Sequence, residues 1–120
     1  KIFDFLDTDL FFRFSNRPAL LSEELDALSP EKLSEPVILD EVQKIPKILD
    51  EVHRLIENRG IRFILCGSSA RKLKRGQSNL LGGRAWRYEL FPLVTPELHE
   101  WKLLDVLNKG MIPSHFQQPL

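Results

Sequence analysis

The sequence predicts an alternating α/β fold built on a parallel sheet. Two short apolar runs, 37–39 and 63–65, end abruptly in polar residues, which is typical of buried parallel strands. Between them, apolar residues recur at helical spacing from Pro46 to Gly60. Strand, helix and strand in this order predict a βαβ unit, whose two strands are parallel.

The segment before the first apolar run predicts one strand and two helices. Residues 1–6 alternate well enough for a strand, and 7–9 (Asp-Thr-Asp) follow as a turn or helix cap. The Phe-rich residues 10–14 predict a short core helix. Ser22 begins S-E-E-L-D-A-L, where a hydroxyl can cap a helix and early carboxylates favour its positive end. Ser29-Pro30 and Glu35-Pro36 then predict a loop.

The clearest predicted helix follows the first apolar run. Pro46 suits a first helical position, and Gly60 supplies a C-terminal stop. His53 is off the apolar stripe and is interpreted as a surface residue. The stripe predicted to cover the sheet consists of Ile48, Leu49, Val52, Leu55 and Ile56.

The last third of the chain predicts shorter elements. Residues 70–74 begin a helical turn, and 77–83 form a loop that would present Arg84. Residues 86–91 (W-R-Y-E-L-F) alternate bulky and charged side chains, which predicts a strand with Trp86 and Tyr88 facing a core. A boundary at 92–97 precedes a helix over 97–107, which 108–110 close.

Composition is that of one globular domain. The chain has 120 residues, of which 42% are hydrophobic, and 17 basic residues balance 17 acidic ones. The single cysteine excludes an internal disulfide and a Cys-based zinc site, and the three histidines lack ligand spacing. No apolar stretch approaches the ~20 residues of a membrane span. We therefore expect a cytoplasmic protein without membrane contact.

Positive charge gathers between Asn58 and Tyr88, where no acidic residue occurs. Such a local field suits a triphosphate, a nucleic-acid backbone or an acidic protein surface. A solvated helix face next to an exposed loop is the alternative interpretation. The residues at which a DNA or protein partner would bind are Arg71, Lys72, Lys74 and Arg75.

Polar side chains stand where both apolar runs end. Asp40 and Glu41 follow the first run, and Gly67, Ser68 and Ser69 follow the second. Because the carboxyl ends of parallel strands meet at one edge, we expect these groups to line one crevice. One carboxylate there can hold Mg²⁺ while its neighbour orients or deprotonates a water, as nucleotide hydrolysis requires. A strand end followed by an acidic helix cap is the alternative.

Three motifs occur in an order and spacing that resemble a known family: P-V-I-L-D-E-V-Q-K-I-P, R-F-I-L-C-G-S-S-A-R-K-L and L-L-G-G-R-A-W-R-Y-E-L-F-P-L. The chain resembles AAA+-type P-loop ATPases, and more closely a prokaryotic group in which the ATPase domain precedes a separate C-terminal domain. The resemblance implies a three-layer P-loop NTPase-like parallel sheet. It places the ATPase domain at residues 1–95 and the start of the C-terminal domain at 96–120.

The resemblance also implies ATP and Mg²⁺ as cofactors and gives roles to individual residues. Asp40 would act on the metal through its water shell and Glu41 would polarise the attacking water. Ser68 or Ser69 would take the sensor-1 position, with Ser68 favoured because Cys66 stands where relatives often carry Thr. Arg84 would reach a phosphate either within its own subunit or as an arginine finger toward a neighbour in an oligomer.

One family motif is missing. None of the six glycines is followed by Lys, so G-x-x-x-x-G-K-[ST], which cradles the phosphates, does not occur. We therefore expect an internal fragment of a longer ATPase, inactive alone, whose sheet lacks its first strand and phosphate loop. A complete domain that has lost its loop is the alternative. The absent strand would leave a gap between the strands at Phe63 and Tyr88, so that the chain is marginally stable or pairs these two strands directly. The alternative function is a non-catalytic module that binds protein or nucleic acid.

Overall fold

The computed structural model describes residues 1–68, 85–98, 100 and 102–114. Contacts divide the chain into two compact units, Lys1–Ala85 and Trp86–Leu120. Each unit is described by itself. The division between the predicted domains, at residue 95, stays a prediction.

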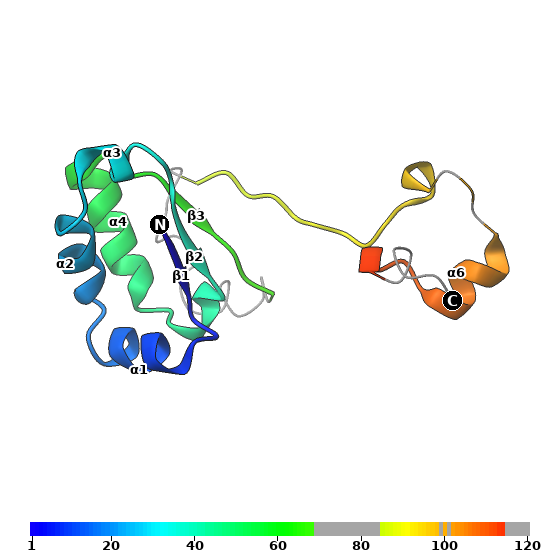
Figure 1. Cartoon of the computed structure of the whole chain (residues 1–120), viewed down its shortest axis with the longest axis horizontal. Helices are drawn as coiled ribbons and strands as arrows, with labels where there is room; N and C mark the ends of the chain where they lie inside the picture. Colours follow the sequence, from blue (N-terminus) through cyan, green and yellow to red (C-terminus); the bar gives the residue numbers. More distant parts are fainter. Residues whose placement is uncertain (69–84, 99, 101, 115–120) are drawn as a thin grey trace. The chain divides into compact units, whose positions relative to one another are not determined.

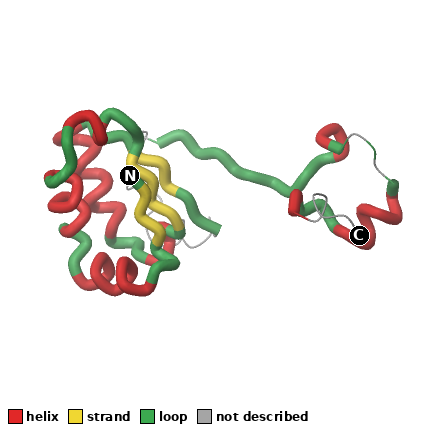
Figure 2. Tube along the Cα trace, viewed as in Figure 1, coloured by secondary structure: helices red, strands yellow, loops and turns green. Residues whose placement is uncertain are grey.

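The first unit contains a sheet of three parallel strands in the order β1-β2-β3 (Figures 1 and 2). The strands are β1 (Ile2–Asp4), β2 (Val37–Asp40) and β3 (Phe63–Leu65). Ile2 pairs with Ile38, and Ile38 pairs with Ile64, so equivalent positions share one face. All three strands were predicted from the sequence, and their parallel arrangement is confirmed.

Helices connect the strands. Between β1 and β2 lie α1 (Thr8–Asn16), α2 (Leu20–Asp26) and α3 (Pro30–Leu33); between β2 and β3 lie the 3-10 turn η1 (Val42–Lys44) and α4 (Ile48–Arg59). The Asp7 side chain caps α1 by accepting from the backbone N–H groups of Asp9 and Leu10, at 2.9 and 3.1 Å. Gly60 ends α4 with φ 62°, a left-handed conformation that glycine adopts without strain.

The core lies between the sheet and these helices (Figure 1). Phe14 of α1 packs against Phe3 of β1 and against Phe5, with ring centroids 5.4 and 5.7 Å apart. The apolar stripe of α4 contributes as predicted, since four of its five residues are buried and Ile56 packs against their cluster. The remaining buried hydrophobic residues are Leu21, Leu25, Val37, Leu39, Val42, Ile45 and Ile61.

The opposite face of the sheet is open in the part of the chain that the structure describes. Ile2 and Ile64 are 62% and 47% exposed there, and Ile38 between them is half-buried. Of the three predicted layers, the described residues therefore build two, the sheet and one layer of helices (Figure 2). Among the described residues of the first unit, β3 pairs with β2 alone.

Three predicted boundaries in the first unit are wrong. The helix predicted to begin with Pro46 starts two residues later, at Ile48. The helix that was predicted to start at Ser22 begins at Leu20, because the chain already turns helically at Ala19 and the serine needs no capping role. Residues Pro30–Leu33, predicted as loop, form α3; its proline occupies the first turn, where a missing N–H costs nothing.

The second unit contains η2 (Thr95–Glu97) and α6 (Leu103–Lys109). The predicted helix over 97–107 is thus correct in kind but starts later, and Gly110 follows its end. The backbone N–H of Val94 donates to the side-chain carboxylate of Glu97 at 2.9 Å, and this bond fixes the start of η2.

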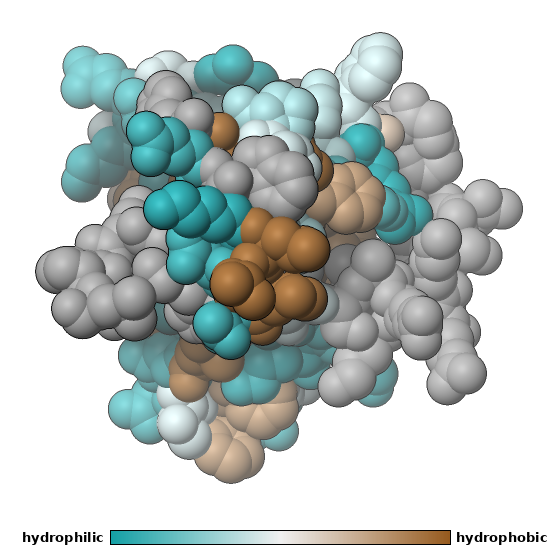
Figure 3. Space-filling view, turned by 90° about the vertical axis from the view of Figure 1, so that its right-hand side faces the viewer, coloured by the Kyte–Doolittle hydropathy of each residue, from teal (hydrophilic) through white to brown (hydrophobic). Residues whose placement is uncertain are grey.

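The strand predicted at 86–91 is wrong, since residues 85–91 form no strand. Trp86 and Tyr88, predicted to face a core, are 90% and 86% exposed. Alternation alone does not make a strand without a partner for its backbone groups. Figure 3 shows that hydrophobic residues, in brown, also reach the surface on the face that it presents. No helix among the described residues is long and apolar enough to cross a membrane.

Candidate functional site

The candidate site lies where β2 and β3 end side by side. The ladder continues past the strands: the Cys66 N–H donates to the Leu39 carbonyl at 2.9 Å, and the Val42 N–H donates to the Cys66 carbonyl at 3.0 Å. These bonds hold the turn after β2 against the segment after β3. The carboxyl ends of neighbouring parallel strands are the usual ligand-binding edge of an open α/β sheet.

Glu41 makes the turn out of β2 in an unusual backbone conformation. It has φ 53° and ψ 37°, and among the described residues it is the one non-glycine residue with positive φ. For a residue with a Cβ this conformation costs about 1–2 kcal/mol. Strain of this kind persists where surrounding contacts fix the backbone, and it gathers at functional sites. Here the buried Val42 and its bond to Cys66 supply that fixation.

Three side chains form a closed ring of hydrogen bonds at this edge. Gln43 Nε2 donates to Glu41 Oε2 and, at 3.3 Å, to Ser68 Oγ. Ser68 Oγ in turn donates to the same Glu41 oxygen at 3.3 Å. One carboxylate oxygen thus accepts from both neighbours, and its direction is set by groups from two strand ends. Hydrogen bonds to an ionised acceptor are stronger than those between neutral groups.

Gln43 is the buried member of the ring, at 9% exposed. Its Oε1 atom is buried and has no hydrogen-bond partner within the described residues. Gly67 lies directly against it, since a Cβ at that position would overlap Oε1 and lie 3.2 Å from Cδ. Glycine at 67 therefore leaves room for the glutamine amide.

Asp40 stands next to the ring at the end of β2. It is half-buried, and its Oδ1 accepts the backbone N–H of Glu41 at 2.9 Å. With Glu41 and Ser68 it makes a set of carboxylate and hydroxyl oxygens, the hard donors that Mg²⁺ prefers. The chemistry of these donors fits the metal that the sequence predicts. No cluster of three or more His, Cys, Asp or Glu side chains that could hold a metal occurs in the part of the chain that the structure describes.

The structure brings together some of the predicted site residues. Glu41 and Ser68 share a hydrogen bond and Asp40 adjoins them. Ser69 and Arg84 lie outside the described residues, as do the basic positions Arg71, Lys72, Lys74 and Arg75. Sequence reasoning missed Gln43, although it lies inside the motif that was recognised. The one indication in the sequence was that Gln43 follows Asp40 and Glu41 closely.

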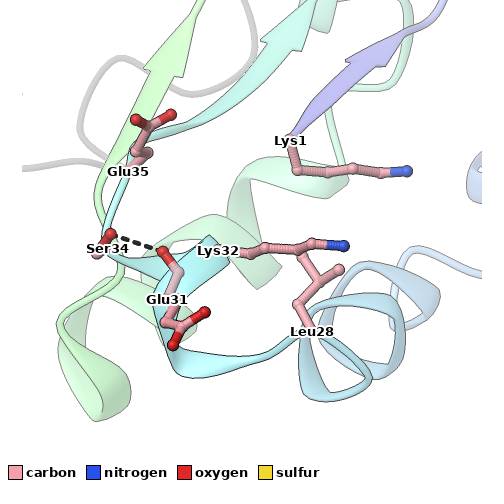
Figure 4. A pocket seen from close by; sticks show the side chains of 6 residues that line it. All are labelled: Lys1, Leu28, Glu31, Lys32, Ser34 and Glu35. Carbon is pink, nitrogen blue, oxygen red and sulfur yellow. Dashed lines mark hydrogen bonds between the residues drawn. The ribbon is translucent and has the colours of Figure 1, made fainter.

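A pocket of about 500 Å³ lies at the other end of the sheet, as Figure 4 shows. Lys1 precedes β1 and Glu35 precedes β2, so this pocket is at the amino ends of the strands. The Ser34 hydroxyl donates to the Glu31 carbonyl there at 2.6 Å. Because open α/β sheets place their chemistry at the carboxyl edge, the ring of Glu41, Gln43 and Ser68 is the stronger candidate.

Three parallel strands in one sheet, with acidic and hydroxyl groups at the carboxyl ends of β2 and β3, agree with a partial P-loop-like α/β fold. A family model described as AAA domain matches residues 2–99. The chain therefore belongs to this family of AAA-type nucleotide-binding ATPase domains. No curated protein and no solved structure matches the chain significantly.

Proposed function

We propose that this chain carries the hydrolysis half of a Mg²⁺-dependent ATPase in which Glu41 activates the attacking water. One observation supports this assignment above all. The Glu41 carboxylate is oriented by Gln43 and Ser68 at the carboxyl edge of two adjacent parallel strands of an AAA domain. A carboxylate held there is suited to take a proton from water during phosphoryl transfer.

Each residue then has a distinct part in the reaction. When bound, Mg²⁺-ATP supplies a γ-phosphoryl group whose charge the metal neutralises. Asp40 would hold the metal through its water shell. Glu41 accepts a proton from the water as the water oxygen forms its bond to phosphorus and the bond to ADP breaks. Ser68, whose hydroxyl can rotate, donates to a phosphate oxygen or to that water.

Two further residues belong to the proposal through the family resemblance. Ser69 is the second candidate for the sensor-1 role. Arg84 would stabilise the charge that develops on the phosphate, within its own subunit or across to a neighbour in an oligomer. The phosphate loop, which the 120 residues do not contain, would be supplied by other residues, so this chain alone should not hydrolyse ATP.

The finer assignments of the sequence are part of the same proposal. They are a prokaryotic ATPase of the group with a separate C-terminal domain, a start of that domain at residue 96, and a cytoplasmic location. A DNA or protein partner would bind the basic positions from Arg71 to Arg75. Titration of the intact protein with labelled DNA at two salt concentrations tests the last point, because phosphate contacts weaken steeply with salt. Salt-sensitive DNA binding without ATP binding would favour the non-catalytic alternative.

The decisive experiment replaces Glu41→Gln in the intact protein. The variant should bind ATP as the wild type does and lose about 10²- to 10⁴-fold in kcat, since the amide accepts no proton at neutral pH. Binding is followed by titration with a fluorescent ATP analogue and turnover by phosphate release. Glu35→Gln, an exposed glutamate at the other edge of the sheet, is the matched control and should change neither quantity. Unchanged hydrolysis by Glu41→Gln removes the assigned role.

A further inference from the structure

The hydrogen bonds of Gln43 are those of a residue that orients other side chains rather than one that contacts a substrate. Its Nε2 carries two hydrogens, and both have acceptors, Glu41 Oε2 and Ser68 Oγ. The side chain is buried, so no donor is left over for a substrate or a metal-bound water. Its contacts end on the two side chains to which the proposed function gives chemical roles.

The backbone explains how a residue so close to Glu41 can reach its carboxylate. Glu41 is left-handed, and the 3-10 turn η1 that follows carries Gln43 back toward the edge of the sheet. The bond from Val42 to the Cys66 carbonyl ties this turn to the segment that carries Ser68. The amide therefore joins the ends of two strands at the point where Glu41 projects.

The orientation of the amide follows from its neighbours. If the amide were reversed, Oε1 would face the Glu41 carboxylate and acceptor would meet acceptor. In the observed orientation Oε1 is buried without a partner in the described residues and lies against Gly67. A buried acceptor without a donor is unfavourable for folding. The orientation of the amide is thus set by its two donors, which both end on Glu41 and Ser68.

We propose that Gln43 is a positioning residue that holds the Glu41 carboxylate in the direction needed to accept the proton from water. The inference rests on the proposed function and deepens it, because it names what sets the activity of the same site. Misplacement of a reacting group by about 1 Å can cost 10²-fold in rate. Loss of the Gln43 donors should therefore lower kcat without a matching change in KM.

The test is made in the intact protein with Gln43→Met, which keeps the length of the side chain and removes its donors and its unpartnered acceptor. We expect kcat to fall about 10- to 100-fold, with KM for ATP and the melting temperature close to those of the wild type. Lys44→Met, at the exposed neighbouring position of η1, introduces the same side chain and should leave kcat within about twofold.

Gln43→Glu is the second variant, since it keeps the shape and cannot donate to Glu41 as a carboxylate. It should lose at least as much kcat as Gln43→Met, and it decides the question if the methionine variant is unstable. Wild-type kcat in a folded Gln43→Met or Gln43→Glu variant overturns the positioning role.

Glu41→Gln, measured beside them, separates the two proposals. If it retains hydrolysis, the proposed function fails. If it is inactive while the Gln43 variants turn over normally, the failure belongs to the role of Gln43 alone.

Discussion

Val42 donates its backbone N–H to the carbonyl of Cys66 at 3.0 Å, just beyond the last register pair of β2 and β3. This bond joins the turn that contains Glu41 to the segment that leads to Ser68. Both side chains therefore hold their places through main-chain contacts that do not depend on their own chemistry. Substitution of either side chain should change activity more than it changes the fold.

Ser68→Ala is the first prediction. The change removes the hydroxyl that donates to Glu41 and accepts from Gln43, so kcat of the intact protein should fall about 10²-fold, the usual effect of deleting one preorganised donor. Because Ser68 is exposed, the free energy of unfolding should fall by only about 1 kcal/mol. Steady-state kinetics and urea unfolding measure the two effects.

Ser34→Ala is the control for that experiment. The Ser34 hydroxyl makes a local hydrogen bond to the Glu31 carbonyl at the amino edge of the sheet, away from the candidate site. It should leave kcat unchanged. Equal activities of the two alanine variants would show that the Ser68 hydroxyl has no part in turnover.

Gly67→Ala is the second prediction. The new Cβ would overlap Gln43 Oε1, so the amide that donates to Glu41 and Ser68 has to shift. We expect kcat to fall about 10-fold or more. The overpacking should also lower the free energy of unfolding by about 1–3 kcal/mol.

Gly60→Ala separates the two effects. A Cβ there has no atom within 4 Å, but its backbone φ of 62° disfavours a side chain. This variant should lose about 1–2 kcal/mol in stability and no activity. If Gly67→Ala turned over as fast as Gly60→Ala, the contact between Gly67 and Gln43 would have no bearing on the site.

Phe14→Ala is the third prediction and concerns the core. The Phe14 ring is fully buried between Phe3 and Phe5, so its removal leaves a cavity beneath β1. The free energy of unfolding should fall by about 3–5 kcal/mol, as measured by urea unfolding of the intact protein. Phe12→Ala, on the same helix but 58% exposed, should cost about 1 kcal/mol or less. Similar losses in both variants would contradict the packing of α1 on the sheet.

The strands and the long helix could be predicted because their signals are local. Apolar runs mark β2 and β3, and the spacing of Ile48, Val52 and Leu55 marks the buried face of α4. The same signals predicted that Glu41 and Ser68 would meet, since parallel strands bring their carboxyl ends to one edge. The hydrogen bond between them agrees with that expectation, and their chemical roles stay predictions.

The part played by Gln43 could not be predicted from the same signals. From the sequence alone, a glutamine at that position would be interpreted as a solvated polar residue. Its burial follows from the left-handed backbone of Glu41, which the sequence pattern does not indicate. The prediction of a strand around Trp86 and Tyr88 was wrong for the opposite reason. Its alternation is a local signal for a strand, but a strand also needs a partner along the sheet, which no local pattern supplies.

The register of the sheet has a consequence for the order in which the molecule can fold. β1 can pair with β2 only after the ribosome has made the chain as far as Ile38. β3 can pair with β2 only after Ile64 has been made. Pairings between such distant segments form slowly, because each must first close a long loop. During synthesis Phe3 and Phe5 therefore stay without this sheet until β2 has been made, and their apolar rings are a target for chaperones in that interval.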